Sequence, residues 1–203
     1  MRLKFFLLVT FLGLLSHEVL SQQLGFAAET GLTTSRISDN QFRRRYTYHF
    51  GVSSSLAITS RINITGALSY VRKGAVFNPN GFGGPGTPSN SSNTGINFDY
   101  LEFAALAGFG QDQFQLRIGP TYSYLTQAMI QFGGVDTENI TDIINNNEFG
   151  VKAGFFYKFK RLESPYITLY YYQGLNDTNF DPLERITSNY FQLSIGYVLV
   201  PDR

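Results

Sequence analysis

Cysteine and tryptophan are both absent from this sequence, and only two histidines occur. Without cysteine the chain forms no disulfide bond and offers neither a thiolate nucleophile nor a cysteine ligand for a metal. The acidic residues and histidines do not cluster at the spacings that metal sites need, and no glycine-rich phosphate loop occurs. We therefore expect no metal and no cofactor, and we find no motif of an enzyme active site.

A long apolar run occurs once, at the N-terminus. Arg2 and Lys4 precede residues 5–15, which are almost entirely apolar, and small residues follow at the exit. This order is typical of a secretory signal peptide, and the run is too short for a transmembrane helix of about 20 apolar residues. We predict a signal peptide at residues 1–21 and a single domain at residues 22–203. A buried N-terminal helix is the alternative interpretation.

Excess charge of either sign is also lacking, since the chain has 16 Lys and Arg against 15 Asp and Glu. The predicted signal peptide carries Arg2, Lys4 and Glu18, so its removal leaves 14 basic and 14 acidic residues. A neutral chain lacks the basic footprint of a nucleic-acid-binding protein. We therefore expect no nucleic acid among its partners.

Glycine and aromatic residues, in contrast, are abundant: the sequence has 20 Gly, 13 Tyr and 19 Phe. An aromatic-rich composition with few helix-favouring runs favours β-strands. No second apolar stretch is long enough to cross a membrane as a helix. Because a bilayer admits only helices and closed barrels, in which every backbone polar group is paired, the remaining membrane option is a β-barrel.

Four segments alternate between large apolar residues and small or polar ones with the two-residue period of a strand. They are residues 45–58, 114–125, 148–159 and 190–199. In the second of these segments the apolar face holds Phe114, Leu116, Ile118, Pro120, Tyr122 and Tyr124. Each segment is long enough for a transmembrane strand of about 9–11 residues.

Four further segments alternate less regularly, at about residues 24–33, 62–77, 96–108 and 166–174. Together the segments predict an all-β fold, an eight-stranded antiparallel up-and-down transmembrane β-barrel. A small, glycine-rich and polar face suits the interior of a narrow barrel but cannot cover a soluble protein. We therefore expect the large apolar face to meet lipid.

The predicted connections between the strands alternate in length. Short links lie at residues 59–61, 110–112 and 160–165, and long polar links lie at residues 35–44, 78–95, 131–147 and 176–187. Short turns at one end and long loops at the other are typical of outer membrane barrels, in which the short turns face the periplasm. An even number of strands also places both termini at the end with the short turns.

Several short motifs follow one another along the predicted strands. They are residues 69–74 (SYVRKG), 96–102 (INFDYLE), 118–120 (IGP), 174–175 (GL) and 193–197 (LSIGY). Together they resemble the PorT-like outer membrane β-barrel family of Gram-negative bacteria, over essentially all of the chain that follows the signal peptide. The chain departs from that pattern at Ala104 and Tyr170, where the family often has proline and arginine. The resemblance implies an eight-stranded barrel in the cell outer membrane and leaves its activity open.

Six ionisable side chains fall on the predicted inner face: Glu29, His49, Glu102, Arg117, Glu148 and Lys152. Acids and bases roughly balance there, and a buried charge is very unfavourable unless it is paired. We interpret them as an inward polar network that fills the lumen, with an ion path or a catalytic pair as the alternative. Because the interior of a small barrel is just wide enough for side chains, we do not expect free diffusion of nutrients.

His49 is the one histidine that remains after the predicted processing, and it raises an enzymatic alternative. Lipid A deacylases and related barrel enzymes use a histidine that lies within hydrogen-bond reach of a serine. Ser53 and Ser55 share the face of His49 but lie further along the same strand, and a cross-strand serine cannot be identified from the sequence. A lipid-modifying enzyme is therefore the weakest of the alternatives.

The leading hypothesis is a non-enzymatic structural or interaction barrel with long extracellular loops and a side-chain-filled lumen. A narrow channel or a secretion-associated barrel is the alternative. The expected partners are outer membrane lipid, lipopolysaccharide and proteins that bind the extracellular loops. The basic run Arg43, Arg44 and Arg45 is predicted at the outer rim of the second strand, where arginine can meet lipopolysaccharide phosphates.

Overall fold

The computed structural model describes residues 24–37, 42–77, 95–111, 113–132, 135–144, 146–159, 165–176 and 188–200. The predicted signal peptide at residues 1–21 lies outside these residues, as do nearly all of the predicted loops 78–95 and 176–187. No helix in the described part of the chain is long and apolar enough to cross a membrane.

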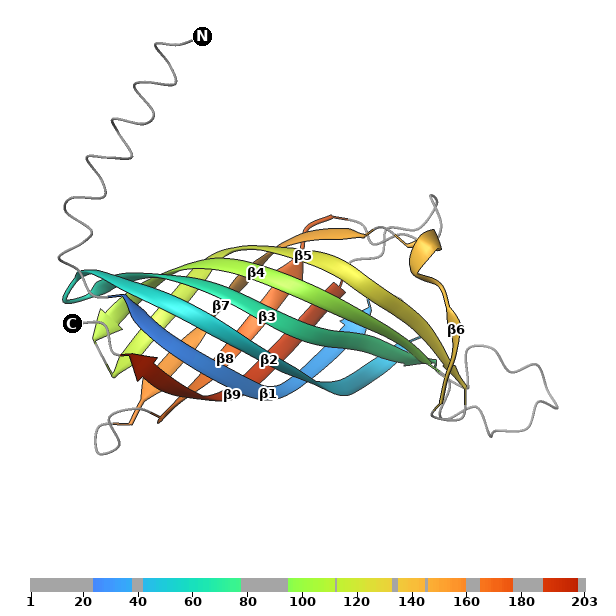
Figure 1. Cartoon of the computed structure of the whole chain (residues 1–203), viewed down its shortest axis with the longest axis horizontal. Helices are drawn as coiled ribbons and strands as arrows, with labels where there is room; N and C mark the ends of the chain where they lie inside the picture. The colour runs from blue at the N-terminus through green and yellow to red at the C-terminus, as the bar shows by residue number, and fades with distance from the viewer. Residues whose placement is uncertain are drawn as a thin grey trace, which may run out of the picture.

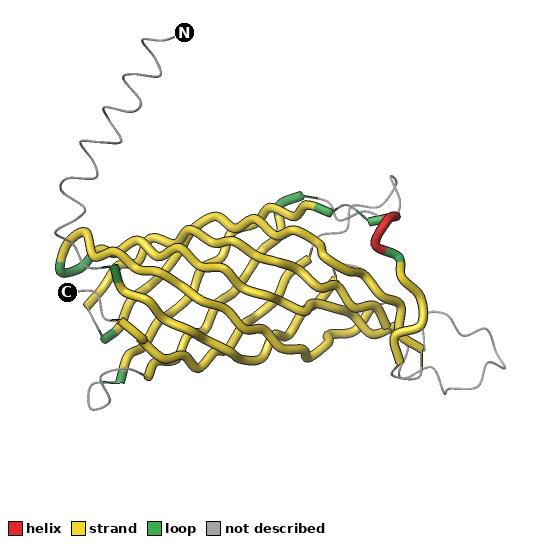
Figure 2. The backbone as a smooth tube through the Cα atoms, viewed as in Figure 1, coloured by secondary structure: helices red, strands yellow, loops and turns green. Residues whose placement is uncertain are grey.

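The described residues contain nine antiparallel strands, eight of which close into a ring (Figures 1 and 2). The ring order is β1–β2–β3–β4–β5–β7–β8–β9, and β9 pairs back with β1, whereas β6 extends the sheet from β5. The strands are β1 (Gly25–Ile37), β2 (Phe42–Thr59), β3 (Ile62–Phe77), β4 (Gly95–Gln111), β5 (Phe114–Phe132), β6 (Val135–Asn139), β7 (Asn147–Lys158), β8 (Pro165–Gly174) and β9 (Ser188–Val200). The prediction of an eight-stranded antiparallel barrel is confirmed.

The two faces of the barrel wall have the polarity that the alternation predicts. On β9, Ile195 is 65% exposed on the outside, whereas Gln192 and Ser194 are buried on the inside. Aromatic rings on the outer face pack across strands, with ring centroids 5.0 Å apart for Phe50 and Tyr70. A soluble protein would bury such apolar side chains, so this outer surface is suited to contact with membrane lipid.

The two ends of the barrel differ in how the strands are joined. The ends of β2, β4 and β7 and the starts of β3, β5 and β8 gather at one end, together with the start of β1 and the end of β9 (Figure 1). We call this the periplasmic end, because outer membrane barrels keep their short turns in the periplasm. The opposite end, which we call extracellular, carries β6 (Figure 1).

The predicted long polar loop at residues 131–147 is wrong in part. β5 continues to Phe132, β6 pairs back onto β5, and a short 3-10 helix follows at Thr141–Ile143. This segment buries Ile140 and Ile144 in an apolar cluster at the extracellular end. The cluster also contains Ala75, Ile96, Phe98, Tyr100, Leu125 and Ala128. The predicted loop 35–44 is also shorter, since the strands β1 and β2 extend into it.

Candidate functional site in the barrel lumen

The six predicted inward residues come from five strands of the ring. Glu102 on β4, Arg117 on β5, and Glu148 and Lys152 on β7 are buried, and His49 on β2 is buried as well. Glu29 on β1 is half-buried. Because of the alternation along each strand, these side chains point into one narrow interior. A charge that is buried there must be paired with a group on another strand.

Lys152 and Glu102 form an ion pair across the lumen, between strands that are not neighbours in the ring. The Lys152 ammonium also donates to Gln192 Oε1 on β9, at 2.8 Å. The Glu102 carboxylate accepts further hydrogen bonds from the Tyr190 hydroxyl and from the Ser123 hydroxyl. The pair therefore ties together strands β4, β5, β7 and β9, and most of its hydrogen-bonding capacity is used.

A second ion pair joins Lys73 on β3 to Glu148 on β7, with 3.0 Å between Nζ and Oε2. Glu148 also accepts hydrogen bonds from the Tyr172 hydroxyl at 3.0 Å and from the Ser188 hydroxyl. The Lys73 ammonium lies 4.4 Å, 4.5 Å and 4.7 Å from the ring centroids of three tyrosines, a cation–π arrangement. These are Tyr100, Tyr172 and Tyr190.

The sequence analysis missed Lys73, although a signal for it was present. Counting by twos from the small inward residue Ser69 on β3 leads through Val71 to Lys73, and all three are buried. Stacked rings of Tyr172 and Tyr190, with centroids 4.5 Å apart, connect the Lys73 pair to the Lys152 pair. We call the two ion pairs and these two tyrosines the lumen layer.

Glu29 and Arg117 lie outside the two ion pairs. Glu29 accepts a long, 3.5 Å hydrogen bond from the Thr168 hydroxyl. The Arg117 guanidinium lies 3.9 Å from the ring centroid of Phe156 and donates twice to Gln115 Oε1, at 3.2 Å and 3.0 Å. The predicted residues thus occupy different levels of the lumen interior and do not form one cluster.

His49 lies at the seam where the first strand of the ring meets the last. Its Nδ1 shares a hydrogen bond with the Thr33 hydroxyl on β1 at 2.9 Å, and its Nε2 shares one with the Ser194 hydroxyl on β9 at 2.8 Å. All three side chains are buried. The serine within reach of His49 is thus Ser194, which alternation could not select because it belongs to a strand 145 residues away.

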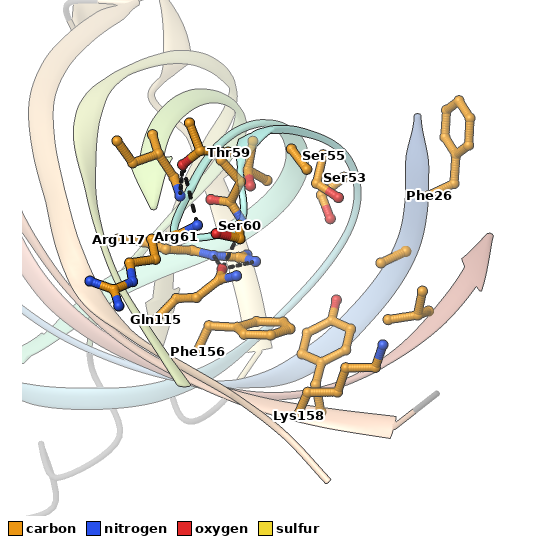
Figure 3. A pocket seen from close by; sticks show the side chains of 17 residues that line it. Phe26, Ser53, Ser55, Thr59, Ser60, Arg61, Gln115, Arg117, Phe156 and Lys158 are labelled. Atoms are coloured by element: carbon orange, nitrogen blue, oxygen red, sulfur yellow. Dashed lines mark hydrogen bonds between the residues drawn. The ribbon is translucent and has the colours of Figure 1, made fainter. Parts of the chain in front are cut away.

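A cavity of about 390 Å³ opens the lumen at the periplasmic end (Figure 3). Its lining mixes cationic side chains, hydroxyls and amides with a few apolar groups. The polar lining residues are Ser53, Ser55, Thr59, Ser60, Arg61, Asn63, Thr65, Gln115, Arg117, Lys158 and Tyr166. Ser53 and Ser55, the serines that the sequence places on the face of His49, therefore line this cavity.

At the extracellular end, the three arginines of the basic run on β2 differ in their exposure. Arg43 and Arg44 are exposed, whereas Arg45 is half-buried and donates a hydrogen bond to Gln131. A further arginine, Arg72 on the neighbouring strand β3, is already paired: it forms a two-point ion pair with Asp99, with nitrogen–oxygen distances of 2.6 Å and 2.7 Å. Arg43 and Arg44 are therefore the members of the run whose side chains face solvent or lipid headgroups.

Comparison with known proteins places the chain among outer membrane barrels. The sequence model described as "Outer membrane protein beta-barrel domain" matches residues 20–179. No curated protein matches the sequence. Among solved structures, the Neisserial surface protein A (NspA) is similar, with a TM-score of 0.54 and 14% identity over 85% of this chain and 96% of that protein.

Two further solved structures are similar at lower scores. Ail, the attachment invasion locus protein of Yersinia pestis, gives a TM-score of 0.45 at 14% identity over 86% of this chain and 99% of Ail. OprG from Pseudomonas aeruginosa gives 0.46 at 10% identity over 89% of this chain and 98% of OprG. The sequence match supports a broad outer membrane barrel family, and the narrower PorT-like assignment stays a prediction.

Proposed function

Because the chain belongs to the outer membrane protein β-barrel domain family and lies in the cell outer membrane of Gram-negative bacteria, we propose that it is a non-enzymatic structural and interaction barrel. Its outer surface contacts membrane lipid and lipopolysaccharide by virtue of this location. We further propose that residues 1–21 are removed as a signal peptide and that residues 22–203 form the barrel domain. The family match from residue 20 onward supports this division.

The lumen layer is the observation that carries the proposal of a filled lumen. Glu102 and Lys152 are 1% and 4% exposed, and Lys73 and Glu148 are also buried. Paired charges and stacked rings from five strands of the ring leave little room for solvent at this level, as a small barrel requires. The apolar cluster around Ile140 and Ile144 lies beyond it at the extracellular end.

A planar bilayer recording tests the filled lumen directly. We expect the refolded protein to give no steady conductance, because the lumen layer blocks a continuous water path. Replacing Tyr172 and Tyr190 together by alanine removes two buried rings, and we expect this double variant to show measurable current. As a control, replacing the exposed Tyr46 and Tyr197 by alanine leaves the bilayer silent. A steady current through the unmodified protein would favour a narrow channel instead.

A secretion-associated role is a second candidate, and its support is the ordered set of motifs that resemble PorT-like barrels. Such a role would use the extracellular end, where proteins can reach the loops.

At the extracellular end we also propose that Arg43 and Arg44 meet lipopolysaccharide phosphates, as exposed arginines can. Replacing both by glutamine and finding the same amount of co-purified lipopolysaccharide would remove this part of the proposal.

The His49 and Ser194 pair resembles a base and nucleophile in geometry, but its surroundings favour a structural role. Both side chains are buried, and the other ring nitrogen of His49 meets the Thr33 hydroxyl, which cannot stabilise a charged imidazole as a carboxylate does. We propose that His49 on β2 stabilises the barrel through its hydrogen bonds to β1 and β9, where the first and last strands of the ring meet. A lipid-modifying role would need lipid to enter this buried site.

Replacing His49 by alanine separates these two roles. The change leaves the Thr33 and Ser194 hydroxyls buried without their partner, and we expect the free energy of unfolding to fall by about 2 kcal/mol. We expect the lipid A profile of cells that express the variant to stay unchanged, as read by mass spectrometry. Replacing the exposed Tyr46 on the same strand by alanine is the stability control. A lipid A species that disappears only in the histidine variant would overturn the non-enzymatic proposal.

A further inference from the structure

The periplasmic cavity differs from the rest of the lumen in its charge. Its lining includes Arg61 from the β2–β3 turn, Arg117 from β5 and Lys158 from the end of β7. None of the described lining residues is acidic. In the lumen layer, by contrast, each buried lysine faces a glutamate. The cavity is therefore a cationic recess, whereas the lumen layer is charge-balanced.

The neutral part of the lining supplies groups that suit a hydroxylated ligand. Ser53, Thr59 and Ser60 add hydroxyls, and Gln115 adds an amide whose oxygen already accepts from Asn63 Nδ2 at 2.7 Å. Figure 3 shows Arg61, Arg117 and Gln115 together on one side of the recess. Such convergent polar groups in a concave site are typical of small-molecule recognition.

Two lining residues carry buried polar atoms without a hydrogen-bond partner. Asn63 is 6% exposed and its Oδ1 is unpaired, and Thr65 is 2% exposed and its Oγ1 is unpaired. A buried polar atom without a partner is unfavourable, and neither of these two atoms is exposed to solvent. Asn63 Oδ1 lies over Gly108, so a ligand in the recess would bind through the accessible side chains of the lining and not through these two atoms.

We propose that this cavity is a binding site for a small hydroxylated organic anion, such as a sugar phosphate or a sugar acid, that enters from the periplasm. Arg61 and Arg117, on the same side of the recess, would hold the anionic group through charge-assisted hydrogen bonds, and Lys158 would add attraction from the other side (Figure 3). The hydroxyl and amide groups would contact the sugar. A volume of 390 Å³ has room for on the order of a dozen water-sized groups, which fits a monosaccharide and its charge.

Calorimetric titration of the full, detergent-folded protein tests the site. The probes are glucose 6-phosphate and gluconate as anions, inorganic phosphate as the charge alone, and glucose as the neutral sugar. We expect both sugar anions to bind at one site, at least tenfold tighter than inorganic phosphate and glucose. Binding should weaken as the salt concentration rises, because the cavity is open to solvent.

Variants locate the binding to the cavity. We expect the double variant Arg61→Gln with Lys158→Gln to weaken the binding of glucose 6-phosphate at least tenfold, since it removes two of the three cations and neither residue belongs to the lumen layer. The control, Arg36→Gln near the extracellular end of β1, removes an exposed cation to which no binding role is assigned and should leave the affinity unchanged.

Backbone NMR gives an independent readout. Addition of glucose 6-phosphate should shift the amide signals of the lining segments 53–65 and 115–117 and leave those of β6 unmoved. Absence of binding at millimolar concentrations of the sugar anions would overturn the proposal. The proposal would also be overturned if glucose bound as tightly as glucose 6-phosphate, or if the Arg61→Gln, Lys158→Gln double variant bound glucose 6-phosphate as tightly as the unmodified protein. NMR shifts confined to the extracellular end would overturn it as well.

Discussion

Replacement of Glu102 by alanine is expected to lower the free energy of unfolding by about 3–5 kcal/mol, because it leaves a buried ammonium without its counter-charge. Lys152 is 4% exposed and would keep Gln192 Oε1 as its hydrogen-bonding partner. The hydroxyls of Tyr190 and Ser123 lose their acceptor at the same time. The measurement is equilibrium unfolding by denaturant in lipid vesicles, followed by tyrosine fluorescence.

A charge-free double variant distinguishes the loss of pairing from the loss of packing. Glu102→Leu combined with Lys152→Met replaces the ion pair by apolar groups of similar size, and such replacements of buried pairs are often neutral or stabilising. We expect the double variant to recover most of the stability that Glu102→Ala loses. Glu138→Ala on β6 removes an exposed carboxylate and should change the stability by less than about 0.5 kcal/mol. A Glu102→Ala variant as stable as this control would show that the lumen pair contributes little.

The inward direction of Glu102 and Lys152 could be predicted from the sequence, but their pairing could not. A period of two residues fixes the face on which a side chain lies. It says nothing about the position of that side chain along the barrel axis, because the strands of a barrel tilt and their register is staggered around the ring. Residues on β4 and β7 meet only once that stagger is set. For the same reason Ser194 could not be assigned to His49, although both faces were predicted.

The error at residues 131–147 has a different physical origin. Asn, Asp and Thr dominate that segment, so its composition is that of a loop. Two of its three isoleucines, Ile140 and Ile144, become buried only because β5 runs on to Phe132 and the chain returns along it. A register shift between β4 and β5 at Asp99 and Tyr100 accompanies this extension. Neither the extension nor the shift has a local sequence signal.

Replacement of Gly154 by alanine is expected to destabilise the barrel by about 3 kcal/mol, near the upper end for overpacking of a filled interior. Gly154 on β7 pairs directly with Tyr170 on β8. A Cβ at this position would lie 2.7 Å from both Cα and Cδ1 of Tyr170, and closer still to the backbone oxygen of Leu169. The tyrosine ring alone could rotate away, but the backbone contacts require the two paired strands to separate.

Gly66 on β3 is the matched control, since it is a strand glycine that faces outward with nothing within 4 Å of the position of its Cβ. We expect Gly66→Ala to be neutral or to stabilise by up to about 1 kcal/mol, because alanine restricts the unfolded chain more than glycine does. Equal effects of the two substitutions in the same unfolding experiment would contradict the close approach at Gly154.

The contrast between these two glycines shows what part of the glycine content of the chain does. Three glycines of the inner face lie under tyrosines: Tyr170 covers Gly154, Tyr172 covers Gly150, and Tyr166 on β8 covers Gly196 on β9. A narrow interior has room for a large ring only where the opposing residue has no side chain. Part of the glycine and tyrosine content thus serves to fill a small lumen with rings, and Gly154→Ala tests that packing at a point where backbone atoms leave no room for a Cβ.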